Sequence, residues 1–200
     1  ARKVFADAQA LLAKIVADKS LTARATYGYF PAGSDGDDIL HVFSADRTRE
    51  VAQFPMPRQR EDKETCLSLA DFIAPLVTIR TTTIPPMGLD GSDAPETGAT
   101  NRMPLDHLGA FIVTAGIGTD ALAAAFERDH DDYSSIMAKA LADRLAEAAA
   151  EYLHDRVRRE WYAPDEKLDH AAILAETYRG IRPAFGYPAC PEHAPKATLF

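Results

Sequence analysis

The sequence contains only two cysteines, Cys66 and Cys190, and they lie far apart in the chain. A structural zinc site needs about four ligands grouped in closely spaced pairs, so this spacing excludes a zinc site built on cysteine. We expect both thiols to be buried and chemically inert. Their scarcity also favours a reducing compartment, and we expect a cytoplasmic location.

Long apolar runs and an excess of basic residues are also missing. No stretch approaches the roughly 20 apolar residues of a membrane-spanning helix, and the first residues lack the apolar core of a signal peptide. Asp and Glu number 30 against 22 Lys and Arg, a net charge of -8 at pH 7, whereas nucleic-acid surfaces need clustered basic residues. We therefore expect neither a membrane nor a nucleic-acid partner.

The remaining composition, 46% hydrophobic and 26% charged, is that of an ordinary globular domain. Apolar residues three or four positions apart predict a helix over residues 4–16. ATYGYF (25–30) and DILHVFS (38–44) predict two strands joined by a loop over PAGSDGD (31–37). REVAQF (49–54) is a third candidate strand, and the segment LADFIAPLV predicts a buried turn or a short helix.

The second half of the chain begins with a segment rich in Pro, Gly, Thr and Asp, residues 81–104, which we interpret as a long loop insertion. HLGAFIVTAG (107–116) then predicts an apolar strand, and TDALAAAFERDH predicts a helix with Thr119 as its N-cap. A helix over residues 169–178 is predicted to end at Gly180. Strands and helices do not alternate regularly, so a doubly wound parallel sheet is disfavoured and the predicted class is α+β.

The longest predicted element is a helix over residues 133–161, which Asp131 and Asp132 can cap. One face of this helix is apolar and is predicted to enter the core. That face comprises Met137, Leu141, Leu145, Ala148 and Tyr152. A second, charged stripe, acidic toward the middle and basic toward the C-terminal end, comprises Asp143, Glu147, Glu151, His154 and Arg158.

The segment RPAFGYPACPEH, residues 182–193, suits neither a helix nor a strand. Its three prolines fix φ and remove main-chain donors, while Gly186 permits a positive φ or a close approach of the backbone. Such a rigid loop can leave main-chain groups available to a polar ligand. Arg182 offers a planar fork for a carboxylate or phosphate, and Tyr187 adds an amphipathic ring. A proline-stiffened structural turn, with Arg182 paired to a helix carboxylate, explains these residues equally well.

This loop resembles the AdoMet-binding loop in the activation domain of cobalamin-dependent methionine synthases, a pattern of Arg, three residues, Gly, Tyr and Pro followed by Cys-Pro-acid-His. The segment HDDYSSIMAKALADRLAEAAAEYLHDRVR is similar to the long helix of that domain, and YFPAGSDGDDI, LADFIAP and GAFIVTAG are similar to other parts of it. The resemblance covers nearly all of residues 1–200, apart from the insertion at 81–104. It implies an AdoMet-binding activation domain that is incomplete at both ends, as a piece of a larger polypeptide or as a shortened relative.

The resemblance implies a bent, mainly antiparallel sheet flanked by helices, in a C-shaped, helmet-like α+β fold. It also implies a role inside a methyltransferase of methionine biosynthesis, where S-adenosylmethionine (AdoMet) and one electron from a flavodoxin-type reductase restore methylcobalamin from inactive cob(II)alamin. The cobalamin is expected to be bound mainly by another domain, of the same or another chain. No metal site and no acid-base residue is expected in this chain, because its work is positioning.

The motif match also implies a role for individual residues. Arg182 is expected to pair with the AdoMet carboxylate, and main-chain groups of Ala184 and Gly186 to contact polar edges of the ligand. Tyr187 is expected near the corrinoid when the domains dock.

Two further positions leave alternatives open. Glu147 matches an acid of the family that faces the ligand, and the sulfonium and ammonium of AdoMet call for a carboxylate. On charge spacing alone, a solvated Glu147 paired with Arg144 is the usual outcome. Phe185 stands where the family usually has another proline, so we expect a looser or reshaped loop.

The sequence leaves two other functions as alternatives. The first is a non-catalytic, stand-alone AdoMet-binding or corrinoid-protein docking module. The second is an unrelated hydrolase that uses Cys190 and His193, although no orienting third group accompanies this pair.

Overall fold

The computed structural model describes residues 1–59, 66–76 and 105–200, so the predicted insertion at 81–104 lies outside the described residues. The chain forms two compact units, and each is described by itself. The first, here called the helical unit, comprises Ala1–Tyr27 and Phe111–Tyr178; the second, the sheet unit, comprises Gly28–Ala110 and Arg179–Phe200.

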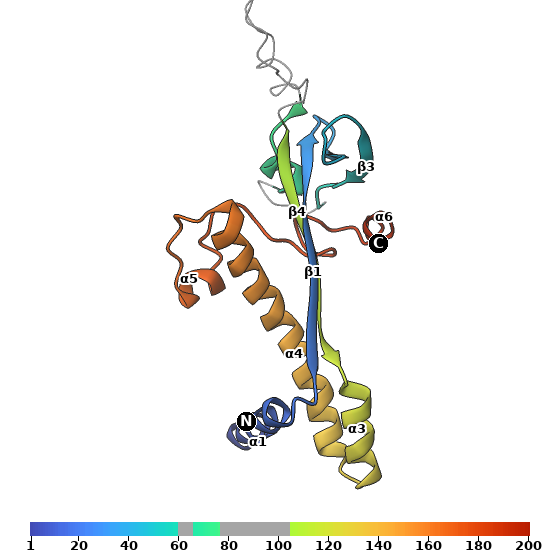
Figure 1. The fold of residues 1–200 in the computed structure, drawn as a ribbon, viewed down its shortest axis with the longest axis vertical. Helices are drawn as coiled ribbons and strands as arrows, with labels where there is room; N and C mark the ends of the chain where they lie inside the picture. The colour runs from blue at the N-terminus through green and yellow to red at the C-terminus, as the bar shows by residue number, and fades with distance from the viewer. Residues whose placement is uncertain (60–65, 77–104) are drawn as a thin grey trace, which may run out of the picture. The chain divides into compact units, whose positions relative to one another are not determined.

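Three helices pack together in the helical unit. The helices α1 (Arg2–Asp18) and α3 (Thr119–Arg128) lie beside the N-terminal half of α4 (Asp132–Val157), as Figure 1 shows. Their contact is a small apolar core formed by the buried side chains of Leu11, Ile15, Met137 and Ala138. The predicted first helix and the predicted apolar face of α4 are therefore confirmed in this half of the unit.

The N-termini of α3 and α4 are capped differently. Asp131 caps α4 as predicted, because its side chain accepts a hydrogen bond of 3.0 Å from the Ser134 N–H. Thr119 is not the N-cap of α3: Gly118 holds that position with a φ of 102°, and Thr119 is the first helical residue. A positive φ suits glycine and strains other residues, which explains why the cap is not the hydroxyl residue.

The predicted faces of α4 are wrong in its C-terminal half. The side chain of Tyr152 is 68% exposed, whereas His154 and Arg158 of the predicted charged stripe are buried. The reason is a distant aromatic residue: the guanidinium of Arg158 lies 4.6 Å from the ring centroid of Tyr178, and the ring of His154 meets the same tyrosine edge-on at 4.8 Å. Arg158 is also paired with Glu166, which compensates its burial.

The segment after α4 is less helical than predicted. The chain leaves α4 through a single π-helical turn, η2 (Arg158–Tyr162), and the next helix, α5 (His170–Leu174), is much shorter than the predicted helix over 169–178. Glu176 adopts a φ of 54°, a left-handed conformation that ends a right-handed helix.

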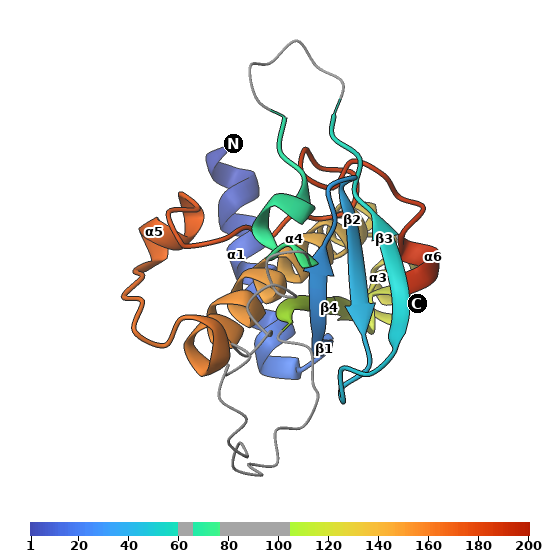
Figure 2. The same ribbon diagram turned by 90° about the horizontal axis from the view of Figure 1, so that it is seen from above.

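A four-stranded sheet has the strand order β3-β2-β1-β4. The pairs β1–β2 and β2–β3 are antiparallel, and Figure 2 shows β1, β2 and β3 side by side. The strands are β1 (Thr22–Ser34), β2 (Ile39–Phe43), β3 (Glu50–Pro55) and β4 (Asp106–Ile117), of which β1 and β4 continue from one unit into the other. The predicted α+β class and mainly antiparallel sheet are confirmed.

The predicted loop at 31–37 begins too early, since β1 continues to Ser34 and only residues 35–38 form the turn. Ala32 pairs with Val42, and Gly33 pairs with His41. A side chain at Gly33 would come within 2.3 Å of the Leu76 side chain. A small-residue segment that looks like a turn in sequence is therefore a strand packed under a bulky neighbour.

The sheet unit has its own apolar core between the strands and the C-terminal segment. Here η1 (Leu69–Phe72) is the short helix predicted from LADFIAPLV, and α6 (Lys196–Leu199) lies close to the C-terminus. The buried core residues are Ala32, Leu40, Val42, Phe54, Met56, Ala70, Ile73 and Cys190. Among the described residues, none of the helices is both long and apolar enough to span a membrane.

The backbone at Gly118 provides a test of the helical unit. A Cβ atom at Gly118 would lie 2.4 Å from the carbonyl oxygen of Ser20, in addition to the strain of a positive φ. We expect Gly118→Ala to lower the free energy of unfolding by about 2–4 kcal/mol, measured by urea denaturation. Gly36→Ala is the matched control, because a Cβ there meets nothing within 4 Å. Equal losses in the two variants would contradict this account.

Candidate functional site

The loop at residues 182–193 folds on itself in the sheet unit. The Gly186 N–H donates to the Cys190 carbonyl at 2.8 Å, and the Cys190 N–H donates to the Tyr187 carbonyl at 2.8 Å. The Tyr187 N–H donates to the Ala184 carbonyl at 3.1 Å. Gly186 has a φ of 100°, as its position in the motif predicted. The loop is thus a compact turn that its own main chain closes.

This closure limits what the loop can offer to a ligand. It uses the Gly186 N–H and one acceptor site of the Ala184 carbonyl. Within the described part of the chain, the Ala184 N–H and the Gly186 carbonyl have no hydrogen-bond partner. The ring of Tyr187 is 63% exposed at the tip of the turn. The closed turn therefore leaves one main-chain donor and one acceptor on exposed residues, next to an exposed aromatic residue.

The underside of the loop is anchored in the core of the sheet unit. Cys190 is buried, with its Sγ 3.6 Å from Met56 Sδ, and the Ala189 carbonyl accepts a hydrogen bond of 2.9 Å from the Leu69 N–H. Phe185 packs partly buried against the same core. The loop is therefore held by packing, at Cys190 and in part at Phe185.

The thiol of Cys190 has no arrangement for nucleophilic catalysis. Burial raises the pKa of the thiol, more than the nearby Lys196 lowers it. The imidazole of His193 lies instead against the Lys196 ammonium, with Nδ1 3.0 Å from Nζ. These contacts speak against the hydrolase that Cys190 and His193 suggested. Neither cysteine forms a disulfide, and Cys66 is half-buried where we expected full burial.

The expected site residues fall into two groups. Arg182, Ala184, Gly186 and Tyr187 belong to the one loop of the sheet unit. Glu147 belongs to α4 in the helical unit, where its side chain is 66% exposed and pairs with Arg144 at 2.8 Å. The open alternative of an Arg144-paired glutamate is thus what the structure shows.

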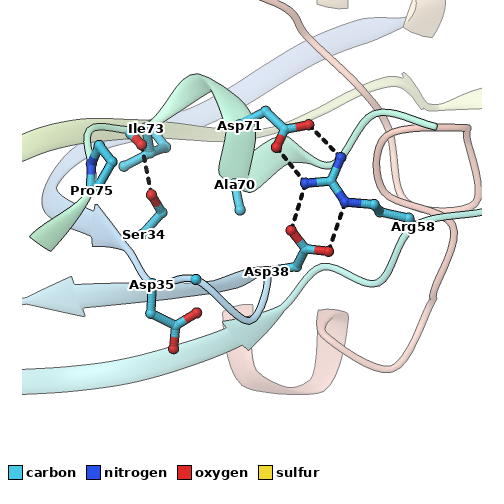
Figure 3. Close-up of a pocket in the computed structure, with 9 residues that line it drawn as sticks. Ser34, Asp35, Asp38, Arg58, Ala70, Asp71, Ile73 and Pro75 are labelled. Atoms are coloured by element: carbon cyan, nitrogen blue, oxygen red, sulfur yellow. Dashed lines mark hydrogen bonds and ion pairs between the residues drawn. The ribbon is translucent and has the colours of Figure 1, made fainter. Parts of the chain in front are cut away.

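A separate cavity of about 350 Å³ lies beside the β1–β2 turn. Figure 3 shows Arg58 at one end of it, between the carboxylates of Asp38 and Asp71. Its guanidinium donates to both carboxylates and to the Cys66 carbonyl, which engages all five of its N–H donors. These bonds raise the pKa of Arg58, with Asp71 the first cause and Asp38 the second.

Arg58 therefore joins the β1–β2 turn to η1 and has no donor left for an anion. No sequence pattern predicts this contact, because its partners Asp38 and Asp71 lie 20 and 13 residues from Arg58 and no period joins them. The one signal in the sequence is that Asp38 lies in YFPAGSDGDDI and Asp71 in LADFIAP, two segments that resemble the family.

A second pairing of one cation with two carboxylates lies on β2. His41 Nε2 is 3.0 Å from Asp35 Oδ2, and His41 Nδ1 is 3.1 Å from Glu50 Oε2. Carboxylates only accept, so both bonds form when the imidazole carries two protons. Burial opposes that charge, but the bonds to Asp35 and Glu50 outweigh it and raise the pKa of His41. The bond to His41 in turn lowers the pKa of Asp35.

The fold and the loop define an α+β domain that presents a rigid, proline-rich turn with an arginine at its start. Residues 1–200 match the family model described as vitamin B12 dependent methionine synthase, activation domain, and the chain belongs to this family. The family expected from the sequence motifs is therefore confirmed.

One solved structure is similar over nearly the whole chain. It is described as the crystal structure of the MetH reactivation domain bound to AdoHcy, with 43% sequence identity and a TM-score of 0.76. The match covers 99% of this chain and 55% of that one, so the chain spans about half the length of this relative.

The His41 pairing predicts a pH-dependent stability. With a raised pKa in the folded state, the imidazolium stabilises the fold fully below the unfolded value of about 6.5 and loses this effect as pH rises through the folded pKa. We expect His41→Gln to lower the free energy of unfolding by about 1 kcal/mol at pH 6 and by less at pH 9. Urea denaturation at both pH values, with the exposed His170→Gln as control, measures this. An equal loss at both would refute the pairing.

Proposed function

We propose that this chain binds AdoMet through the loop at 182–193 and positions it for the reactivation of a cobalamin cofactor. The observation that carries the proposal is the closed turn at Gly186, in which the exposed residues Ala184 and Gly186 keep one main-chain donor and one acceptor, and Tyr187 is 63% exposed. The description of a relative 43% identical as bound to AdoHcy supports the same ligand class.

The chemistry of these residues fits AdoMet. Arg182 supplies a planar, permanently charged fork for the carboxylate of the ligand. The Ala184 N–H and the Gly186 carbonyl can each make one hydrogen bond to its polar edges, because the turn leaves them without other partners among the described residues. Glu147 supplies a negative charge for the ligand's ammonium and sulfonium, at the expense of its exposed pair with Arg144. Such an exposed pair is weak and easily exchanged.

The proposed role is that of a positioning domain in a methyltransferase. When bound, AdoMet supplies the methyl group that, with one electron, restores methylcobalamin. The residues of this chain hold the methyl donor in one orientation. Such orientation lowers the barrier of a reaction between two bound groups. Exposed Tyr187 faces the corrinoid in this scheme, and the partners are a cobalamin-binding domain and a flavodoxin-type reductase in the cytoplasm.

Calorimetric titration of the chain with AdoMet tests the loop. We expect saturable binding, and we expect Arg182→Ala to weaken it by about 1.5–3 kcal/mol, the usual contribution of a charged hydrogen bond, or roughly ten- to 150-fold. Arg49→Ala, which removes an exposed arginine of the same unit, is the control.

The two negative results have different meanings. Unchanged affinity in Arg182→Ala would remove that residue from the site and leave AdoMet binding intact. A folded wild type that does not bind AdoMet would contradict the proposed function itself.

The carboxylate on α4 is tested in the same titration. Because Glu147 supplies the only carboxylate in this proposed set, we expect Glu147→Gln to weaken AdoMet binding by about 1 kcal/mol, roughly fivefold. Glu160→Gln is the matched control, since Glu160 also forms an exposed ion pair with an arginine of its own helical segment, Arg156, at 2.6 Å. A loss of the same size in both variants would mean that Glu147 acts only through surface charge.

A further inference from the structure

The imidazole of His193 lies directly against the main chain of Gly186. A Cβ atom built on Gly186 would come within 2.7 Å of His193 Cε1 and 2.8 Å of its Nε2. Real side chains do not approach so closely, so the histidine ring occupies the space that any other residue at 186 would fill. Because Gly186 has no side chain, its backbone can adopt a φ of 100° and the His193 ring has room to lie against it.

The ring is itself held in place from the other side. Lys196, at the start of α6, directs its ammonium at His193 Nδ1 from 3.0 Å. An ammonium can only donate, so Nδ1 is the acceptor in this contact. The same ammonium lies 6.0 Å from the ring centroid of Phe185, on the other flank of the turn. A contact at this distance is at the outer limit of a cation–π interaction.

Lys196 therefore contacts both Phe185, the residue before Gly186, and the His193 ring that lies against Gly186. Three members of the loop, Phe185, Gly186 and His193, are connected in this way to α6, which packs on the core of the sheet unit through Leu199. The turn has a buried anchor at Cys190 and this second, exposed anchor at His193.

We propose that His193 is a positioning residue for AdoMet binding: its ring, held by Lys196, fixes the Gly186 turn from which the loop presents Tyr187 and the main-chain groups that meet the ligand. This inference rests on the proposed function of the loop. His193 does not touch the ligand in this account and acts through Gly186.

The experiment combines a measurement of the loop with a measurement of the ligand. In the full 200-residue chain, hydrogen exchange of the Gly186 amide reports on the bond to the Cys190 carbonyl, and calorimetry with AdoHcy reports on binding. We expect His193→Ala to speed exchange of that amide and to weaken AdoHcy binding, each about tenfold. His193→Phe keeps a ring over Gly186 but lacks the Nδ1 acceptor for Lys196, so it should restore both in part. His170→Ala, an exposed histidine of α5, is the control.

The outcomes separate the two claims. Unchanged exchange at Gly186 in His193→Ala overturns the positioning role, whether or not a ligand binds. Faster exchange with unchanged AdoHcy affinity also overturns it, because the loop would then not need this anchor to bind. A wild type that does not bind AdoHcy overturns the proposed function, while the exchange measurement still decides whether His193 holds the turn. A lower melting temperature in His193→Ala alone, without these changes, counts against the inference.

Discussion

The hydrogen bond between the Gly186 N–H and the Cys190 carbonyl joins the exposed arm of the proposed binding loop to its buried arm. Cys190 is 3% exposed and belongs to the same core as the strands of the sheet unit. The position of the exposed ring at Tyr187 is therefore set by core packing one short turn away. Prolines on both sides restrict the unfolded loop, so less conformational entropy is lost when the loop takes this shape. A site that works by orientation depends on such a fixed backbone.

In the sheet unit, two cations are each shared between two carboxylates. Arg58 bonds two aspartates, and His41 bonds an aspartate and a glutamate, so each cation reduces the repulsion within its pair of carboxylates. Each arrangement includes one aspartate of the β1–β2 turn, Asp38 for Arg58 and Asp35 for His41. The cavity beside Arg58 is consequently lined by polar groups that already have partners, which is the reason to place ligand binding in the loop at 182–193.

Sequence patterns predicted the elements whose cause is local. A glycine within a proline-rich segment predicted the positive φ at Gly186. The spacing of apolar residues predicted the half of α4 that packs on α1. Burial of His154 and Arg158 could not be predicted, because it depends on Tyr178, which arrives from an irregular segment after α5. The contacts of Arg58 with Asp38 and Asp71 could not be predicted for the same reason, because contacts between distant, irregular segments leave no periodic pattern in a sequence.

Phe185 illustrates how one departure from the family pattern changes the physics of the loop. A proline at that position stiffens the backbone covalently and does so whether or not the rest of the unit is well packed. A phenylalanine leaves φ free, and its stiffness comes from the ring, which packs on the core and lies near the Lys196 ammonium. Rigidity that comes from packing is lost when the core loosens. In this chain, the order of the proposed binding loop is therefore coupled to the stability of the sheet unit, and local opening of the core would loosen the turn at Gly186.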